Sequence, residues 1–274
     1  LQSTSSGVGT LRLVSGTFTV GDAGAQTTNA LSAGTLVVEI QAGATLRKSL
    51  AGTTSVTTGV TSVTNAGTVD VTSGTLVLAG GGTSAGAFTV ASGSTLRFGG
   101  GTHNLDASSS VSGAGTGDFN AGTVNLAGTY NLTGTTTVTG GTANWTGTLT
   151  SLGPTLTASA GTANLSSGEA VSLTTLNLSG TGILAGSDTV TVSGATTWSG
   201  GTMQGTGLTQ AQGGLHLSGN SGRNLGGGRV LAHEGTGDWT GTGQLPSTGS
   251  GVGTLRLVSG TFTVGDAGAQ TTNA

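Results

Sequence analysis

The stretch GTVNLAGTYNLTGTTTVTGGTANWTGTL, residues 122–149, contains the pattern from which the fold of this chain can be worked out. It consists of short segments such as TVNL (123–126) and TYNL (129–132), in which polar and apolar residues alternate, separated by pairs that contain Gly. Such alternation is typical of strands with one buried face, and Gly between strands indicates tight turns. The residues expected to be buried, here and in later repeats, are Leu126, Leu132, Val138, Leu165, Leu178, Val190 and Val192.

A Gly-Thr pair marks each repeat of this pattern. Its Thr falls at positions 123, 142, 162, 181 and 202, with spacings of 19, 20, 19 and 21 residues. Repeats of about 20 residues that hold several short strands are typical of a β-solenoid, in which stacked coils bury what one coil alone would expose. We predict an all-β fold, a single-stranded parallel β-helix with about 20 residues per coil, right-handed like most parallel crossovers. The Gly-Thr pairs should form one column with steps of ~4.8 Å.

The composition argues against several other classes of protein. Gly contributes 56 of 274 residues, and each Gly inside a helix costs ~1 kcal/mol relative to Ala. Hydrophobic residues still make up 33% and the net charge is −3, whereas disordered chains combine low hydrophobicity with high charge. Seven Lys and Arg without a basic run give no basis for a nucleic-acid partner. There is no Cys, no signal-peptide pattern at the start, and no apolar run of the ~20 residues that a membrane span needs.

The first part of the chain is less regular. Between residues 30 and 64 strands are indicated at 36–40, 45–47 and 54–57, but no single coil frame passes through all of them. We expect Glu39, Arg47 and Lys48 to lie outside the coils, on a longer loop.

One long segment occurs twice. Residues 245–274 repeat residues 1–30 with two differences, Pro246 for Gln2 and Gly249 for Ser5, at an offset of 244 residues. We interpret 1–244 as one tandem-repeat unit and 245–274 as the start of the next, within a longer array. Both copies should enter the solenoid at the same corner, so that one unit makes about 12 whole coils and spans roughly 58 Å.

Several phrases resemble one family. NAGTVDVTSGTLVLAGGG (65–82), GGGTHNLDASSSVSGAGT (99–116), the stretch 122–149 and ATTWSGGTMQGTG (195–207) are similar to the large bacterial surface proteins of the beta-strand-repeat or autotransporter-adhesin-like type. The resemblance covers most of the 244-residue unit. It implies a secreted, very long β-helical chain on or around a bacterial cell, and names no ligand.

Some β-helices are polysaccharide lyases, with carboxylates and a basic residue in an outer cleft. Arg97 and Asp118 lie 21 residues apart, about one coil, with His103 and Asp106 nearby. The simpler interpretation of all four is solvated turn and outer-face residues. No pair of carboxylates at coil spacing indicates a metal site.

A second weak cluster comprises His216, His233, Glu234 and Asp238. The sequence HEGTGD lacks the second His of a helical zinc motif. GTGDF (115–119) and GTGDW (235–239) are a repeated signature, which we interpret as turns followed by an inward aromatic, because calcium-binding arrays need consecutive copies.

Three other features of the sequence bear on function. Trp145, Trp198 and Trp239 have the aromatic surface that stacks on sugars, but each follows a strand pattern that favours burial. Stacked Thr-x-Thr pairs would suit an ice-binding face, yet the pairs 17/19, 137/139, 155/157 and 189/191 are scattered. The Asn-x-Ser/Thr sequons at residues 131, 144, 164 and 177 occur by chance in a chain so rich in Thr and Ser.

These observations favour a structural function, a repeat segment of an extracellular bacterial filament, stalk or giant adhesin, without catalysis and without cofactor or metal. The alternative is a carbohydrate-binding or polysaccharide-cleaving β-helix. The expected partners are neighbouring units joined end to end, with lateral self-association and cell-surface glycans as further possibilities. The expected location is the cell surface or extracellular space.

Overall fold

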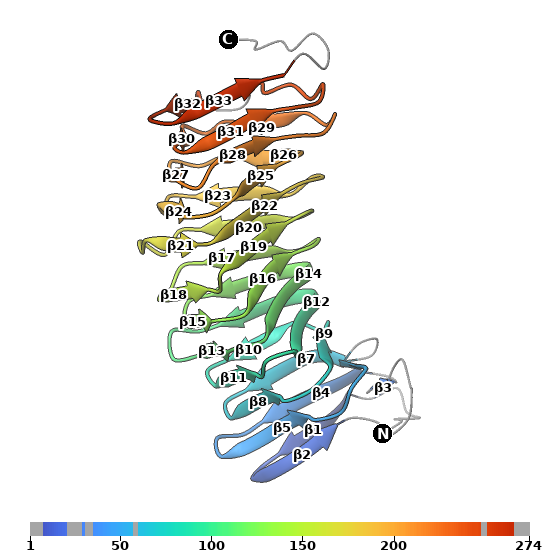
Figure 1. Ribbon diagram of the computed structural model, residues 1–274. Helices are drawn as coiled ribbons and strands as arrows, with labels where there is room; N and C mark the ends of the chain where they lie inside the picture. Colours follow the sequence, from blue (N-terminus) through green and yellow to red (C-terminus); the bar gives the residue numbers. More distant parts are fainter. Residues whose placement is uncertain (1–7, 21–28, 31–34, 57–59, 248–250, 266–274) are drawn as a thin grey trace.

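The structure is a computed structural model that describes residues 8–20, 29–30, 35–56, 60–247 and 251–265. The described residues form an all-β fold without helix, a stack of coils of roughly 21 residues each. Figure 1 shows this elongated stack, with the N-terminal strands at one end and the C-terminal strands at the other. The predicted β-solenoid is therefore confirmed.

Each coil passes through three faces, which we call the first, second and third in chain order. Strands of one face pair with their equivalents one coil away, in parallel and in register. The first face contains β1 (Val8–Leu13), β4 (Thr35–Ile40), β7 (Val60–Asn65), β10 (Gly82–Ser84), the second halves of β12 (Thr95–Leu105) and β14 (Thr116–Leu126), β17 (Thr142–Trp145), β20 (Thr162–Leu165), β23 (Ile183–Gly186), β26 (Gly201–Met203) and β29 (Arg223–Leu225).

The second face consists of a seven-stranded and a five-stranded sheet. The seven strands are β2 (Gly16–Val20), β5 (Ala44–Lys48), β8 (Thr68–Val71), β11 (Ala87–Val90), β13 (Ser110–Gly113), β15 (Thr129–Leu132) and β18 (Leu149–Leu152). The five are β21 (Val171–Leu173), β24 (Val190–Val192), β27 (Leu208–Ala211), β30 (Val230–His233) and β32 (Thr254–Leu257).

The third face merges with the first into one 21-stranded sheet, because β12 and β14 run from one face into the other. Its strands are β3 (Asn29–Ala30), β6 (Thr53–Val56), β9 (Thr75–Leu78), the first halves of β12 and β14, β16 (Thr135–Val138), β19 (Thr155–Ala158), β22 (Thr175–Leu178), β25 (Thr196–Trp198), β28 (Leu215–Leu217), β31 (Thr236–Trp239) and β33 (Thr261–Val264).

The interior is one continuous core, since alternation places every second side chain of each strand inside the stack. All seven residues predicted to be buried are at most 2% exposed, and they are Leu126, Leu132, Val138, Leu165, Leu178, Val190 and Val192. The bore also holds large rings. Phe98 stacks on Phe119 at 5.4 Å, and Phe119 meets the edge of Trp145 at 5.1 Å between ring centroids.

The predicted column of Gly-Thr pairs is confirmed with one exception. Thr123, Thr142 and Thr162 are successive partners on the first face, and Thr202 belongs to the same column. The fourth member is Ile183, not Thr181, since Thr162 pairs with Ile183. Two extra residues at the corner before β23 move the Gly180-Thr181 pair out of the column. The corner can vary in length because its residues do not pack into the core.

The expected outer loop at Glu39, Arg47 and Lys48 is wrong. Glu39 lies on β4 and Arg47 on β5, both facing outward within the stack. Lys48 points inward from β5 and is 1% exposed. Its ammonium group donates to the backbone oxygen of Leu50, and burial lowers its pKa. The sequence ATLRK alternates inward and outward, so Lys48 occupies the inward position that follows Ala44 and Leu46.

The expectation that both copies of the repeated segment enter at the same corner is also wrong. Thr10 to Leu13 belong to β1 on the first face, whereas the identical residues Thr254–Leu257 form β32 on the second face. Likewise Thr17 to Val20 lie on the second face and Thr261–Val264 on the third. Coils at the start are longer, 27 residues from Val8 to Thr35 against 19 from Asn65 to Ser84, so 244 residues are not a whole number of coils.

The core predicts a strong response to an inward charge. Leu126→Asp should lower the free energy of unfolding by about 3–5 kcal/mol, because the carboxylate would be buried without a partner. Thr129→Asp, at an exposed outward position, should change it little. Thermal or denaturant unfolding of the two variants measures the difference, and equal stabilities would mean that inside and outside are assigned wrongly.

Candidate functional site

The outward side chains form ladders along the stack. On the first face the amide of Asn125 donates to Asn104 at 2.7 Å, that of Asn144 to Asn125 at 2.9 Å, and that of Asn164 to Asn144 at 3.0 Å. In-register stacking brings these side chains together because each Asn stands at the same point of successive coils. The amides of the sequons at Asn144 and Asn164 are therefore engaged with their neighbours.

A column of Thr runs along the third face. Its seven consecutive members are Thr53, Thr75, Thr95, Thr116, Thr135, Thr155 and Thr175. The Thr-x-Thr pairs considered from the sequence are divided between faces, since Thr17 and Thr191 lie on the second and Thr157 on the third. The column was missed because its signal is a single Thr that follows each corner at coil spacing, rather than a pair.

Arg97 and Asp118 do come together, as their spacing predicted. They are partners on the third face, with 2.6 Å between Arg97 Nε and Asp118 Oδ2. One coil further along, Thr137 and Thr139 donate to the other oxygen of Asp118 at 3.0 and 2.9 Å. The carboxylate is thus saturated by a cation on one side and two hydroxyls on the other.

The same arrangement recurs on the other faces. On the second face Arg47 Nε lies 2.8 Å from Asp70, which also accepts from Thr89 at 2.7 Å. On the first face Arg12 Nε lies 2.5 Å from Glu39. In each case the Arg stands one coil before the carboxylate. These pairs bind the coils to one another, and each of the three carboxylates is engaged with an Arg one coil away.

Most of the GTGDF signature, from Thr116 to Phe119, lies in β14, and only Gly115 stands in the bend before the strand. Gly117 faces inward, Asp118 outward and Phe119 inward. A Cβ on Gly117 would stand 2.4 Å from Tyr130 Oη, so Gly is required because aromatic rings fill the bore at this level. Burial raises the pKa of the Tyr130 phenol, whose oxygen lies 3.0 Å from Thr136 Oγ1.

GTGDW repeats this construction at the C-terminal end. Gly237 faces inward, and Asp238 pairs with His216 one coil before it, at 3.2 Å from Nδ1. The predicted inward aromatic of the signature is confirmed, since Trp239 is buried. Trp145 and Trp198 are buried too, so no indole is presented to a sugar.

The other members of the two predicted clusters lie apart. His103 points into the core, 5.0 Å from the ring of Phe98, with Nε2 3.1 Å from the Gly100 oxygen. Asp106 stays outside, where hydrogen bonds from the side chain and backbone of Ser108 lower its pKa. His233 is buried on the second face, and Glu234 follows it at the end of β30. Among the described residues no group of three His, Cys, Asp or Glu side chains could hold a metal ion.

Two buried arginines were not foreseen. The Arg229 guanidinium donates to Thr209 Oγ1 at 3.0 Å and to the backbone oxygen of Gln204 at 3.1 Å. Burial lowers its pKa to about 10, partly offset by the charge of Asp188. Arg223 lies 5.4 Å above the ring of Trp239 and donates to the Ser218 oxygen at 2.6 Å. Both guanidinium groups donate hydrogen bonds to backbone oxygens inside the stack.

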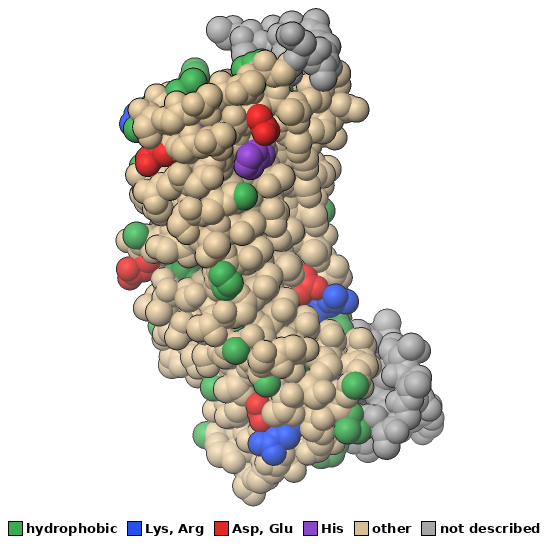
Figure 2. All heavy atoms as spheres, in the orientation of Figure 1, with side chains coloured by type: hydrophobic (Ala, Val, Ile, Leu, Met, Phe, Trp, Pro, Cys, Tyr) green, Lys and Arg blue, Asp and Glu red, His purple; other side chains and the backbone are tan. Residues whose placement is uncertain are grey.

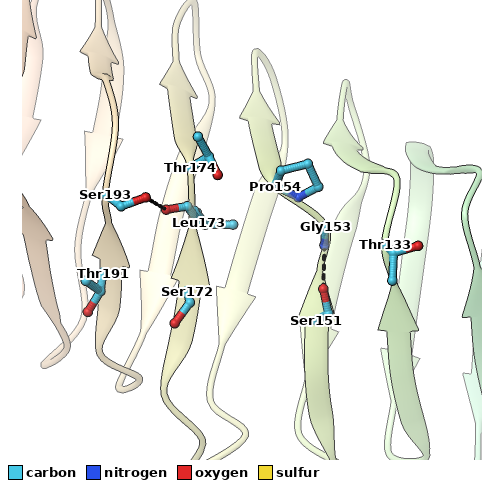
Figure 3. Close-up of a pocket in the computed structure, with 9 residues that line it drawn as sticks. All are labelled: Thr133, Ser151, Gly153, Pro154, Ser172, Leu173, Thr174, Thr191 and Ser193. Carbon is cyan, nitrogen blue, oxygen red and sulfur yellow. Dashed lines mark hydrogen bonds between the residues drawn. The ribbon is translucent and has the colours of Figure 1, made fainter. Parts of the chain in front are cut away.

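A shallow groove lies where the second face is interrupted between β18 and β21. It has a volume of about 420 Å³ and is lined by hydroxyls, one Gly, one Pro and one Leu (Figure 3). Pro154 has no N–H to donate, and Gly153 has φ +81°, so the chain leaves the sheet here. Ser151 Oγ donates to the Leu132 oxygen at 2.7 Å and Ser193 Oγ to the Leu173 oxygen at 3.3 Å. Neither aromatic nor charged side chains line the groove.

Comparison with known proteins finds no family model, curated protein or solved structure that matches this chain. In the part of the chain that the structure describes, no helix has the length and apolar character of a membrane span.

The inward glycine of GTGDF gives a testable prediction. Gly117→Ala should destabilise the fold by about 1–3 kcal/mol, because the added methyl overlaps Tyr130 Oη and Leu132. Tyr130→Phe alone should cost about 1 kcal/mol through the lost hydrogen bond. The double variant should be more stable than the sum of the two losses predicts, and strict additivity in denaturant unfolding would contradict the proposed contact.

His103 predicts a pH dependence. Burial lowers its pKa below 6.5, so the unfolded chain binds a proton more readily and stability is lost as the pH falls through about 6.5. His103→Val, which matches Val124 one coil away, should lose less stability between pH 7 and pH 5 than the parent. Thr129→Val, an exposed substitution that leaves every titratable side chain in place, should behave like the parent. Equal pH profiles for parent and His103→Val would refute the assignment.

Proposed function

We propose that this chain is a structural repeat segment of an extracellular bacterial filament, stalk or giant adhesin. The observation that carries the proposal is how its outward polar groups are used. Arg97, Asp118 and the Asn104 ladder bind side chains of adjacent coils instead of converging on a site. Such ladders join successive coils and stiffen a rod.

The outer surface supports the same proposal. Figure 2 shows a face made mostly of uncharged polar groups and backbone, with few charged side chains scattered over it. All three Trp are inside the stack, where they support the core. Cell-surface location and bacterial origin rest on the resemblance of the repeat phrases, and the fold is compatible with both.

The carbohydrate alternative depends on the groove at Pro154. Its hydroxyls give hydrogen-bonding capacity, but Ser151 and Ser193 already donate to backbone oxygens, and the aromatic surface that stacks on sugars is missing from its lining. The structural role is therefore favoured. Binding of soluble glycans that is lost in Ser172→Trp, which would fill the groove, would reverse this preference.

The proposal predicts that a two-unit chain is a longer rod of the same thickness. We would extend the chain after Ala274 with a second copy of residues 31–274, since 245–274 already stand for residues 1–30 of that copy. Small-angle X-ray scattering should show the long dimension growing by roughly 54 Å, about eleven coils of ~4.8 Å, with an unchanged cross-section. A compact or bent particle would contradict a structural rod.

A further inference from the structure

The two copies of the repeated segment are covered on opposite sides. Leu13 and Leu257 are the same position of the repeat, yet Leu13 is 9% exposed and Leu257 is 60% exposed. Each position has one paired strand, on opposite sides: Leu13 pairs with Ile40 of β4, which follows it, and Leu257 pairs with His233 of β30, which precedes it, with no described strand beyond β32. Residues 35–48, which form β4 and β5, are therefore the roof of the repeated segment.

The C-terminal copy shows the other side. β32 lies on β30, and β33 lies on β31. Phe262 stands over Gly237, where a Cβ would come within 3.0 Å of the Phe ring, and it meets the His233 ring edge-on at 5.1 Å. Its counterpart Phe18 has β5 above it and is 37% exposed, because no described strand lies beneath β2. β30 and β31 therefore form the layer beneath the repeated segment, which we call the floor. In this layer Gly237 leaves room for the Phe ring of the repeat.

Each copy supplies the half of the contacts that the other lacks. We propose that β32 and β33 form the joint to a second copy of the unit, held between the floor β30 and β31 and the roof 35–48 of the following unit. The inference rests on the proposed role as a repeat segment and adds the geometry of the joint. In it, the Arg256 side chain takes the place of Arg12 and pairs with the counterpart of Glu39.

The joint also turns the following unit. Eleven coil steps separate β2 from β32 on the second face, and the counterpart of β2, namely β33, lies one face further along. One unit therefore spans eleven full coils plus one of the three faces of the next coil. Successive units are rotated by one of the three faces, and the original orientation returns after three units.

Paired cysteines in the two-unit chain test the joint, because the chain has no Cys of its own. Thr254 pairs with Val230 on the second face in the structure, whereas a joint of whole coils would place it on the first face, in the column of Thr10 that passes through Asn224. Neighbouring parallel strands lie ~4.8 Å apart, within the Cα separation that a disulfide accepts. Val230→Cys with Thr254→Cys should oxidise almost completely, and Asn224→Cys with Thr254→Cys should stay reduced, as measured by mass spectrometry.

Hydrogen exchange tests the roof in the same chain. The amides of 254–257 and 261–264 should exchange about 100-fold more slowly than in the one-unit chain, because they become interior to the stack. In the control, the residue of the second unit that corresponds to Val38, an inward residue of the roof, is replaced by Asp. Because this charge prevents the roof from packing, the amides of 254–257 and 261–264 should exchange as fast as in the one-unit chain.

The outcomes separate the two proposals. A disulfide at 224/254, no disulfide in either pair, or unchanged exchange overturns the joint. In each of these cases a rod of doubled length in scattering would still support the structural role. A disulfide at 230/254 together with slower exchange supports the joint.

Discussion

In-register parallel stacking is the constraint on which the rest of this structure depends. Each strand pairs with the strand one coil away, so equivalent residues lie directly above one another over the whole stack. Inward columns then merge into a single core, and outward columns become ladders of Asn, Thr or alternating charge. A coil is not stable by itself, because its apolar side chains find partners only in the coils on either side.

Stacking also explains which parts of the fold could be predicted. The alternation in TVNL and TYNL identified strands, inside and outside, and the 21-residue spacing of Arg97 and Asp118 placed them as neighbours. The corners were the difficulty. Ile183 replaces Thr181 in its column, and the long first coils set the face on which residues 254–264 lie, because a corner loop can change length without disturbing inward packing. Lys48 was misplaced since its charge outweighed the alternation that put it inside.

The candidate site was predicted in part for the same reason. Coil spacing reveals which outward residues meet, and it found Arg97 with Asp118, but it does not say which polar residue turns inward. His103 and His233 occupy inward positions and are separated from the carboxylates that precede or follow them in sequence. The inward role of Gly117 and Gly237 was not visible either, because it depends on rings contributed by other coils, Tyr130 for the one and Phe262 for the other.

The interruption of the second face at Pro154 has a mechanical consequence. Backbone ladders run along the axis of the stack, so a pull on its ends loads them coil after coil. From β1 to β31 each step is held by three ladders, except that among the described strands no ladder joins β18 to β21, and only the pairings of the other two faces hold there. Tension would part the interior of the stack first at this step. Every coil then released yields about 21 residues of chain, roughly 70 Å at full extension, so the rod lengthens under force before its covalent backbone is strained.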